Sequence, residues 1–595
     1  MRKLLRGLGP VLKGLRCDGV TGRTAGCLFG KLLYFDVLWC AATTFTPFSR
    51  LSTWWCAGLV AAVLALPWVL SRRRWLAVAV LLAADAWLVA NLMYARTYYT
   101  PIPLESYLMA GNLADFMQSV IDSLRWADAL FPASTLAVAL WMYRRPKPLA
   151  PVPRLRYVAG VSAACLLTFG AIGGTGGFVR SYAGLRLSAH LFASGPALYT
   201  LAGTLFYDAN SAEPVFTEAE RRRIERWLAE RPAPVTGDSL PVRRNCVVIL
   251  AESLESWVLE REVEGQRITP WLDSLLRDPA TFYAPRVLTQ VKGGRSIDAQ
   301  LLLLAGLLPV NSGTYSVQYP TNRYLTLQKA LKERWGTRNY LLTVDKEKTW
   351  NQAVIARQFG IDTLLAYADF RLTDEAFGNR KRAGDRSFFR QCQEKMERGE
   401  VWPVGEAAFV QCVTYSGHAP FVLPEELKSI SFSERIPDLM NRYMTTAHYT
   451  DEAIGRFVAY LRSRPDYAET LVVITGDHEG LASYRKDLCA TEAGRGVVSD
   501  RPFTPFIVLN SPVGGRYEAV MGQVDMYPTL LQLLGLGGYA WTGLGESVLS
   551  ARKPPFAVSP QLEVVGEATD TTQVRRLREA YDIADVIIRF DYFAR

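Results

Sequence analysis

Long apolar stretches fill the first third of the chain, and they limit how it can fold more than any other feature. Five stretches occur, and each approaches the ~20 residues that an α-helix needs to cross a bilayer. The first contains Lys31 and Asp36 and the third contains Asp85, so a buried soluble helix is the alternative for any single stretch. Together they predict a five-helix transmembrane domain over residues 1–178. The stretches are residues 26–48, 54–71, 75–95, 128–143 and 156–175.

Basic residues lie on one side of these stretches. They precede the first stretch (residues 2–16), separate the second from the third (72–74) and separate the fourth from the fifth (144–156). The positive-inside rule therefore places the N-terminus in the cytoplasm, and five crossings place everything after about residue 176 outside. The basic and then apolar start is similar to a signal peptide, but no small-residue cleavage site is obvious. We expect an uncleaved anchor in the cytoplasmic (inner) membrane.

The overall charge follows from this arrangement. The chain has a net charge of +10 and a mean hydropathy of +0.06, although 21% of its residues are charged. Much of the basic excess lies at the N-terminus and in the short tracts, which indicates membrane topology rather than nucleic-acid binding. The cysteines after Cys165 contain no CxxC pair, so a zinc ribbon or thioredoxin motif is excluded. A disulfide remains open among Cys246, Cys392, Cys412 and Cys489.

Three regions are predicted beyond the membrane part. Residues 179–240 have the pattern of a linker with surface helices, and Thr217–Glu230 suits either a helix on the membrane face or a plain solvated helix. From residue 241 to 555, runs of Val, Ile and Leu that are apolar on both faces alternate with helical patterns. This alternation predicts an α/β domain with a mostly parallel sheet. Residues 556–595 are expected to pack on that domain as a C-terminal extension.

Polar residues follow four of the predicted strands. Glu252 ends the first, Ser296 follows the second, and His418 and the Asp477–His478 pair follow two later strands. Ligands of such sheets gather beyond the carboxyl ends of the strands, so we expect these side chains at one edge. A lone Asp-His pair is more often structural. With a Glu and a hydroxyl beside it, however, it offers oxygen and imidazole ligands for one divalent metal.

Ser296 stands at the predicted N-terminus of the helix SIDAQLLLLAGLL. The free amides and the dipole of a helix N-terminus favour an anion there. A metal can lower the pKa of a coordinated hydroxyl and neutralise a phosphoryl group, which would suit Ser296 as a nucleophile. An ordinary helix N-cap needs a similar placement. The local sequence leaves both roles open.

These motifs, in this order, resemble the lipoteichoic acid synthase-like phosphoglycerol transferases of the alkaline phosphatase and sulfatase superfamily. The resemblance covers nearly the whole chain: the five spans, the linker and an outer domain of sulfatase type. It identifies Glu252 in ILAESLESW as a metal ligand and Ser296 in GGRSIDAQ as the nucleophile. It likewise identifies Asp477 and His478 in TGDHEG as metal ligands and His418 in SGHAPF as a substrate-site histidine.

The resemblance also implies a reaction and a cofactor. Glu252, Ser296, Asp477 and His478 would bind one divalent metal ion, Mn²⁺ in the first place and Zn²⁺ or Mg²⁺ as alternatives. A phosphoglycerol group would pass from a membrane phospholipid through a phosphoserine at Ser296 to an acceptor hydroxyl. His418 would stabilise or protonate an alcohol oxygen. The acceptor, a glycan, polymer or lipid, and the oligomeric state are not indicated, and no obligate protein partner is evident.

The segment TVDKEKTWNQ departs from the family pattern. Asp345, Trp350 and Asn351 match and are expected to bind substrate. Thr343, however, stands where the family has His, and Gln352 stands where it has Arg. A Gln cannot supply the charge of a guanidinium. The transferred group, glycerol phosphate or ethanolamine phosphate, is therefore open.

Other functions fit the sequence less well. A phosphoethanolamine transferase shares the five spans but usually has more cysteines and a different nucleophile motif. A sulfatase or phosphodiesterase shares the fold, but a sulfatase needs Cys/Ser-x-Pro-x-Arg, and Ser296 is followed by Ile-Asp-Ala-Gln. A catalytically silent membrane binding protein would not need all four metal ligands. Glu479 receives no role from the sequence.

Overall fold

A computed structural model of the chain forms two compact units, Met1–Pro214 and Val215–Arg595. Each unit is described by itself. The structure describes residues 19–41, 51–98, 102, 124–144, 153–174, 216–231, 240–311, 313–373, 376–377, 382–568 and 570–595.

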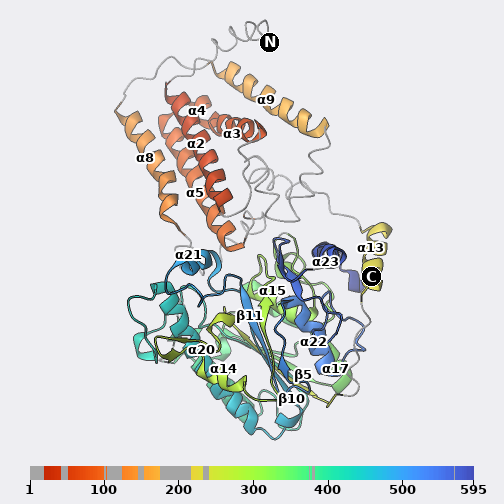
Figure 1. Cartoon of the computed structure of the whole chain (residues 1–595). Coiled ribbons are helices and arrows are strands. Elements are labelled where there is room, and N and C mark those ends of the chain that lie inside the picture. The colour runs from red at the N-terminus through yellow and green to blue at the C-terminus, as the bar shows by residue number, and fades with distance from the viewer. Residues whose placement is uncertain are drawn as a thin grey trace. The chain divides into compact units, whose positions relative to one another are not determined.

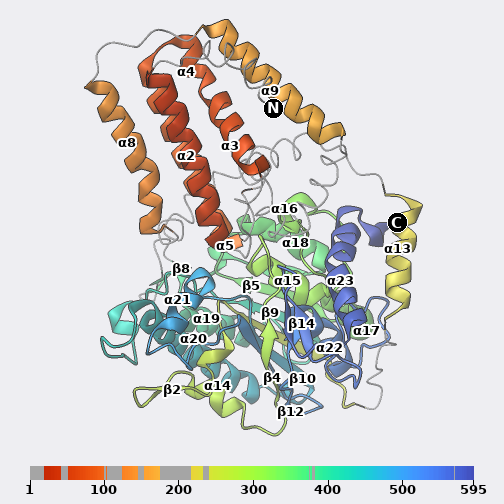
Figure 2. The ribbon, with the colours of Figure 1, turned by 45° about the horizontal axis from the view of Figure 1, so that its top comes forward.

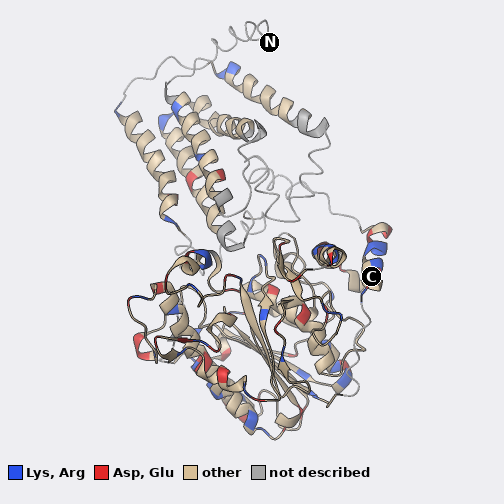
Figure 3. Ribbon diagram, viewed as in Figure 1, with Lys and Arg blue, Asp and Glu red and all other residues tan. Residues whose placement is uncertain are grey.

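The N-terminal unit is helical at all five apolar stretches (Figure 1). The second stretch is divided, because α3 ends at Leu64 and α4 begins at Leu66 with a proline in its first turn. Figure 3 shows few charged residues along these helices. Among the described helices, one segment, Arg74–Met93, is both long and apolar enough to cross a membrane. Five crossings therefore remain a prediction. The helices are α2 (Gly19–Ala41), α3 (Leu51–Leu64), α4 (Leu66–Ser71), α5 (Arg74–Tyr98), α8 (Leu130–Tyr143) and α9 (Arg154–Gly174).

A buried ion pair joins three of these helices. Lys31 of α2 donates to the carboxylate of Asp85 on α5, and both residues are about 5% exposed or less. Thr135 of α8 donates its hydroxyl to the other oxygen of Asp85, and Lys31 also donates to the carbonyl of Phe131. Ionisable groups in such surroundings are costly unless they are paired. The pair explains how an apolar stretch can carry Lys31 and still pack.

We predict that Lys31→Met lowers the stability of the N-terminal unit by about 3–5 kcal/mol, because it leaves Asp85 buried without its cation. The double variant Lys31→Met/Asp85→Leu should recover most of the loss, since it removes both charges. Thermal unfolding of the purified protein in detergent measures this, with Arg154→Met as an exposed control. A double variant less stable than Lys31→Met would contradict the account.

The C-terminal unit is built on one mixed sheet with the strand order β12-β4-β11-β10-β1-β9-β5-β6, in which β12 is the short edge strand Gly515–Arg516. The central strands β10, β1, β9, β5 and β6 are parallel, and β11 is antiparallel to both neighbours. This confirms the predicted α/β domain with a mostly parallel sheet. The main strands are β1 (Asn245–Ala251), β4 (Phe282–Leu288), β5 (Arg338–Thr343), β6 (Thr363–Leu365), β9 (Ala408–Val413), β10 (Thr470–Gly476) and β11 (Phe503–Leu509).

Helices cover both faces of the sheet, so its central strands are buried on both sides (Figure 2). Along β1, Val248 belongs to the hydrophobic core of one face and Val247 to that of the other. The first face carries α15 (Ser296–Ala305), α17 (Leu327–Trp335), α18 (Gln352–Phe359), α22 (Met526–Leu533) and α23 (Thr571–Arg589). The second carries α14 (Pro270–Leu275), α19 (Asp385–Glu397) and α20 (Asp438–Ser463).

Helix α13 (Glu218–Ala229) packs on the C-terminal helix α23, yellow against dark blue in Figure 1. Its Ile224 and Trp227 are buried in the core, and the Arg576 guanidinium lies 4.1 Å from the centroid of the Trp227 ring. Thr217 and Glu220 cap its start. One face of this segment is therefore buried, which neither alternative from the sequence included.

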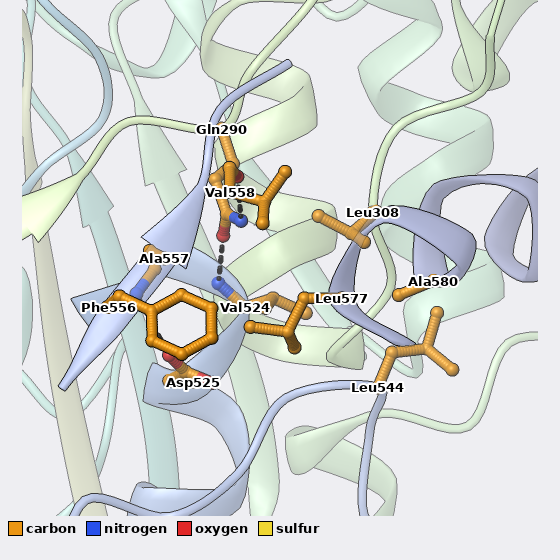
Figure 4. A pocket seen from close by; sticks show the side chains of 11 residues that line it. Gln290, Leu308, Val524, Asp525, Leu544, Phe556, Ala557, Val558, Leu577 and Ala580 are labelled. Carbon is orange, nitrogen blue, oxygen red and sulfur yellow. Dashed lines mark hydrogen bonds between the residues drawn. The ribbon is translucent and has the colours of Figure 1, made fainter. Parts of the chain in front are cut away.

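The strands β14 (Phe556–Val558) and β15 (Val564–Gly566) complete the C-terminal extension. A small, largely apolar cavity lies between β14, α23 and the segment before α22 (Figure 4). Gln290 lines this cavity, where its side chain donates to the Val558 carbonyl at 2.9 Å and accepts the Val524 N–H at 3.0 Å. The extension is thus tied to the sheet. The four cysteines of this unit, Cys246, Cys392, Cys412 and Cys489, are free thiols.

Candidate active site

The pairing of β1 with β10 brings the predicted metal ligands together. Ala251 pairs with Gly476, so Glu252 and Asp477 leave the sheet side by side. Gly476 permits this approach, because a Cβ there would lie 1.9 Å from the Leu254 carbonyl oxygen. His478 Nε2 lies 3.5 Å from Glu252 Oε1 and 3.4 Å from Asp477 Oδ2. The three side chains form one buried cluster.

Ser296 completes this cluster from the start of α15. Its Oγ lies 3.5 Å from Glu252 Oε2 and 3.4 Å from His478 Nε2. The N-cap of the helix is Arg295, with a φ of 49°, so Ser296 is the first helical residue. Of the two roles that the sequence left open for Ser296, the ordinary N-cap does not describe its position. Its hydroxyl instead faces Glu252 and His478.

The turn before Ser296 is held by Asp298. Its carboxylate accepts the N–H groups of Lys292 and Gly294, each at 2.9 Å. A Cβ at Gly294 would lie 2.3 Å from that carboxylate, so only glycine fits there. The sequence GGRSID therefore encodes a turn that delivers Ser296 to the site.

The donor set fits a divalent metal ion. Asp477 Oδ1 accepts the N–H groups of Ser253 at 2.7 Å and His478 at 2.8 Å. Its Oδ2 is buried and has no hydrogen-bond partner within the described ranges. Burial, and next the charge of Asp477, raise the pKa of Glu252 well above its ordinary value. Two buried carboxylates with an unused oxygen and an imidazole could therefore hold a cation, and oxygen with imidazole suits Mn²⁺, Zn²⁺ or Mg²⁺.

Glu479, which the sequence left unassigned, pairs with Arg295. The two side chains form a mostly buried ion pair, and Arg295 also donates to the Glu479 carbonyl at 2.9 Å. Burial alone would raise the pKa of Glu479, yet Arg295 and then His478 bring it below its ordinary value. Arg295 Nη2 lies 2.9 Å from His478 Nδ1. Arg295, the residue before Ser296, therefore contacts both Glu479 and His478, one of the predicted metal ligands.

Glu255 links the two ligand-bearing loops, and no motif had singled it out. Its carboxylate accepts the N–H groups of Gly480 at 2.8 Å and Leu481 at 2.9 Å, two and three residues after His478. Arg485 donates to its other oxygen at 2.6 Å. The residue is fully buried. Its place three residues after Glu252 was the one available signal, and such spacing alone has no specific meaning.

The predicted substrate residues divide into two groups. Asp345 follows β5 and His418 follows β9, at the same sheet edge as Glu252. His418 Nδ1 lies 2.7 Å from the Ala419 carbonyl oxygen, and its ring stacks on Tyr415 with centroids 5.5 Å apart. These contacts fix the orientation of the imidazole ring.

Trp350 and Asn351 form the second group and lie in a tight turn before α18. Both have a positive φ, of 52° and 56°. The Asn351 amide donates to the Ser316 carbonyl at 3.0 Å, so its nitrogen supports the fold. Gln352 is buried, and its side chain bonds that of Gln300 on α15 at 3.1 Å. No guanidinium therefore enters the site from position 352.

Two families match the chain. The family described as Sulfatase matches residues 244–536, and that described as Lipoteichoic acid synthase N-terminal domain matches residues 53–175. The lipoteichoic acid synthase-like YvgJ of Bacillus subtilis is 27% identical over 329 residues, which cover 53% of this chain and 51% of that protein. The chain thus spans about half the length of this relative.

Two further proteins are similar. The lipoteichoic acid synthase of Staphylococcus aureus is 23% identical over 482 residues, covering 78% of this chain and 73% of that protein. The crystal structure of the lipoteichoic acid synthase LtaP from Listeria monocytogenes superposes with a TM-score of 0.50 at 16% identity, over 63% of this chain and 97% of that one. The last similarity concerns the fold alone.

The sheet and the buried ligand cluster at its edge define a domain of the alkaline phosphatase and sulfatase superfamily. The two family matches in this order, together with the relatives, show that the chain is a lipoteichoic acid synthase-like protein of that superfamily.

We predict that Mn²⁺ stabilises the C-terminal unit by about 3 kcal/mol at a hundredfold excess over its Kd, because the ion binds the folded cluster alone. Asp477→Asn should remove most of this gain, since it takes away the ligand with the unused oxygen. Calorimetric unfolding with and without Mn²⁺ measures the difference.

Asp451→Asn is the matched control. Asp451 lies on α20, away from the cluster, and is also buried. Its carboxylate accepts the backbone N–H groups of Trp271 and Leu272. This variant should be less stable and still gain fully from Mn²⁺. An equal loss of the gain in both variants would place the ion elsewhere.

Proposed function

We propose that the protein is a metal-dependent phosphotransferase that moves a phosphoglycerol group from a membrane phospholipid to an acceptor hydroxyl. One observation carries this proposal: the Ser296 hydroxyl lies 3.5 Å from Glu252 Oε2 and 3.4 Å from His478 Nε2, at the start of a helix. A nucleophile, a metal-binding cluster and a helix N-terminus are thereby combined at one point. The acceptor belongs to a glycan, a polymer or a lipid.

The reaction proceeds in two displacements at phosphorus. Ser296 Oγ attacks the phosphodiester, the O–P bond to the donor alcohol breaks, and that alcohol leaves with a proton. The acceptor hydroxyl then attacks the phosphoserine, and the Ser296 oxygen is released. A divalent ion bound there would lower the pKa of the Ser296 hydroxyl and neutralise the charge of the phosphoryl group.

Other residues of the chain orient these groups. Glu252, Asp477 and His478 would hold the ion together with Ser296, and Mn²⁺ is the proposed occupant. His478 is oriented from the other side of its ring, where its Nδ1–H donates to the Glu479 carbonyl at 3.1 Å and leaves Nε2 for the ion. His418, at the neighbouring strand end, is placed to pass a proton to or from an alcohol oxygen.

The proposed setting is the outer face of the cytoplasmic membrane. The basic tracts support a cytoplasmic N-terminus and five crossings, which place the catalytic domain in the periplasm or the extracellular space. The match to the lipoteichoic acid synthase N-terminal domain over residues 53–175 supports the same arrangement. A lipid donor in that membrane would need no transport to reach the enzyme.

The proposed domains follow from this setting. A transmembrane domain spans residues 1–178, a linker spans 179–240, a catalytic domain spans 241–555, and the extension spans 556–595. Within the linker, α13 packs on α23 and so supports the extension.

We predict that the full-length, Mn²⁺-loaded protein forms a glycerol phosphate adduct on Ser296 when it is mixed with phosphatidylglycerol vesicles. Mass spectrometry of the peptide that contains Ser296 measures the adduct. Ser296→Ala should form none, while Ser274→Ala, which removes an exposed hydroxyl, should form as much as the natural chain.

Phosphatidylethanolamine vesicles provide the second arm of this experiment. An ethanolamine phosphate adduct in place of glycerol phosphate would replace the proposed donor by the alternative one. The absence of any adduct with either lipid would contradict phosphotransfer through Ser296 and favour a catalytically silent binding protein.

A further inference from the structure

Arg382 is a buried arginine that lies against the predicted substrate residue Asp345. It stands in the short strand β8 (Arg382–Ala383) and is 1% exposed. Its Nε donates to Asp345 Oδ1 at 2.7 Å, and its Nη2 is in ion-pair contact with the same oxygen. The Asp345 carboxylate thus occupies one side of the guanidinium fork.

The other side of the fork has no acceptor among the residues that the structure describes. Nη1 is buried, and neither terminal nitrogen has a partner that meets hydrogen-bond geometry within the described part of the chain. The rings of Tyr415 and Tyr367 lie 4.9 and 5.8 Å from the guanidinium carbon. Ring faces stabilise the charge, but they do not accept the N–H groups at the edge. A buried cationic donor without an acceptor is expensive and calls for a ligand.

The position of Arg382 connects it to the candidate active site. Tyr415 follows β9 and stacks on His418. Thr414, one residue earlier, accepts the Glu252 N–H through its hydroxyl at 2.9 Å. Since β5, β9 and β1 are neighbours in the sheet, Asp345, Tyr415 and Glu252 leave it at one edge. Arg382 therefore lies beside the predicted catalytic cluster.

Other polar groups at this edge already have partners. The guanidinium of Arg295 is engaged by Glu479 and His478, and the amide of Gln352 is engaged by Gln300. Arg382, in contrast, retains a donor edge. A phosphoryl oxygen is the acceptor that a guanidinium edge suits best.

We propose that Arg382 binds the phosphate of the substrate, with a terminal N–H group donating to a non-bridging phosphoryl oxygen. Asp345 keeps the guanidinium in place through its contact with Nε. Because Arg382 is closed off from solvent, the ligand reaches it beside Asp345, whose side chain is 34% exposed. This inference rests on the proposed phosphotransfer, and it identifies the group that binds the charge of the transferred phosphate.

A purely structural role makes a different prediction. If Arg382 served to orient Asp345 and nothing else, then removing either partner would affect phosphate binding alike. If Arg382 binds the phosphate, removal of Arg382 weakens binding, whereas removal of the Asp345 charge frees a cation and does not. The two variants therefore distinguish a positioning residue from a binding residue.

The experiment is calorimetric titration of inorganic phosphate into the full chain in detergent, loaded with Mn²⁺. Arg382→Gln should weaken phosphate binding by about tenfold or more, as expected for a lost charge-assisted hydrogen bond. The phosphate affinity of Arg382→Lys should lie between those of Arg382→Gln and the natural chain. Asp345→Asn should bind phosphate at least as tightly as the natural chain. A parallel Mn²⁺ titration shows that the cluster of each variant is intact.

Arg386→Gln is the matched control. Arg386 follows Arg382 by four residues, contacts the Glu452 carboxylate at 3.4 Å and lies 4.8 Å from the Tyr449 ring centroid. Its removal should leave phosphate binding unchanged. Equal weakening in Arg382→Gln and Asp345→Asn, unchanged binding in Arg382→Gln, or no phosphate binding by the natural chain would each overturn the inference.

The outcome is separable from that of the proposed function. Arg382-dependent phosphate binding without a Ser296 adduct would refute transfer from phospholipid and retain Arg382 as a phosphate-binding residue. A Ser296 adduct together with phosphate binding that does not depend on Arg382 would refute the role of Arg382 and retain the proposed phosphotransfer.

Discussion

The parallel pairing of β1 with β10 is the contact on which the candidate site depends. It aligns Ala251 with Gly476, so the next residue of each strand, Glu252 and Asp477, enters the same small volume. The approach requires a glycine at position 476, because any side chain there would collide with the backbone at Leu254. A shift of one residue in this register would turn one carboxylate to the other face of the sheet.

The rest of the site is built to hold that juxtaposition. Glu255 fastens the loop after His478 to the loop after β1, and Arg295 reaches across from the Ser296 turn to the same loop. The charged groups of both residues are paired with other groups of the protein, so they hold the two loops in place. Asp298 fixes the Ser296 turn through two backbone N–H groups. The carboxylates of Glu252 and Asp477 repel one another at this distance, and the attraction of each to a bound cation would offset that repulsion.

Sequence reasoning predicted which side chains come together, because parallel strands place their carboxyl ends at one edge and the motifs follow those ends. Glu252, Asp477 and His478 needed no more than strand order and chemistry to be grouped. Arg382, Glu255 and the Arg295–Glu479 pair escaped, since each depends on a contact between segments far apart in the chain. The same holds for α13, whose partner α23 lies some 350 residues away. The departure at Gln352 was visible in the sequence, whereas a guanidinium arriving from β8 was not.

The central claim is that Glu252, Asp477, His478 and Ser296 together bind one divalent ion. Crystals of the protein soaked in Mn²⁺, measured at the manganese absorption edge, test it directly. The account predicts an anomalous difference peak about 2 Å from a carboxylate oxygen of Glu252, from Asp477 Oδ2, from His478 Nε2 and from Ser296 Oγ. The absence of a peak among these four atoms, or a strongest peak elsewhere in the molecule, would contradict it.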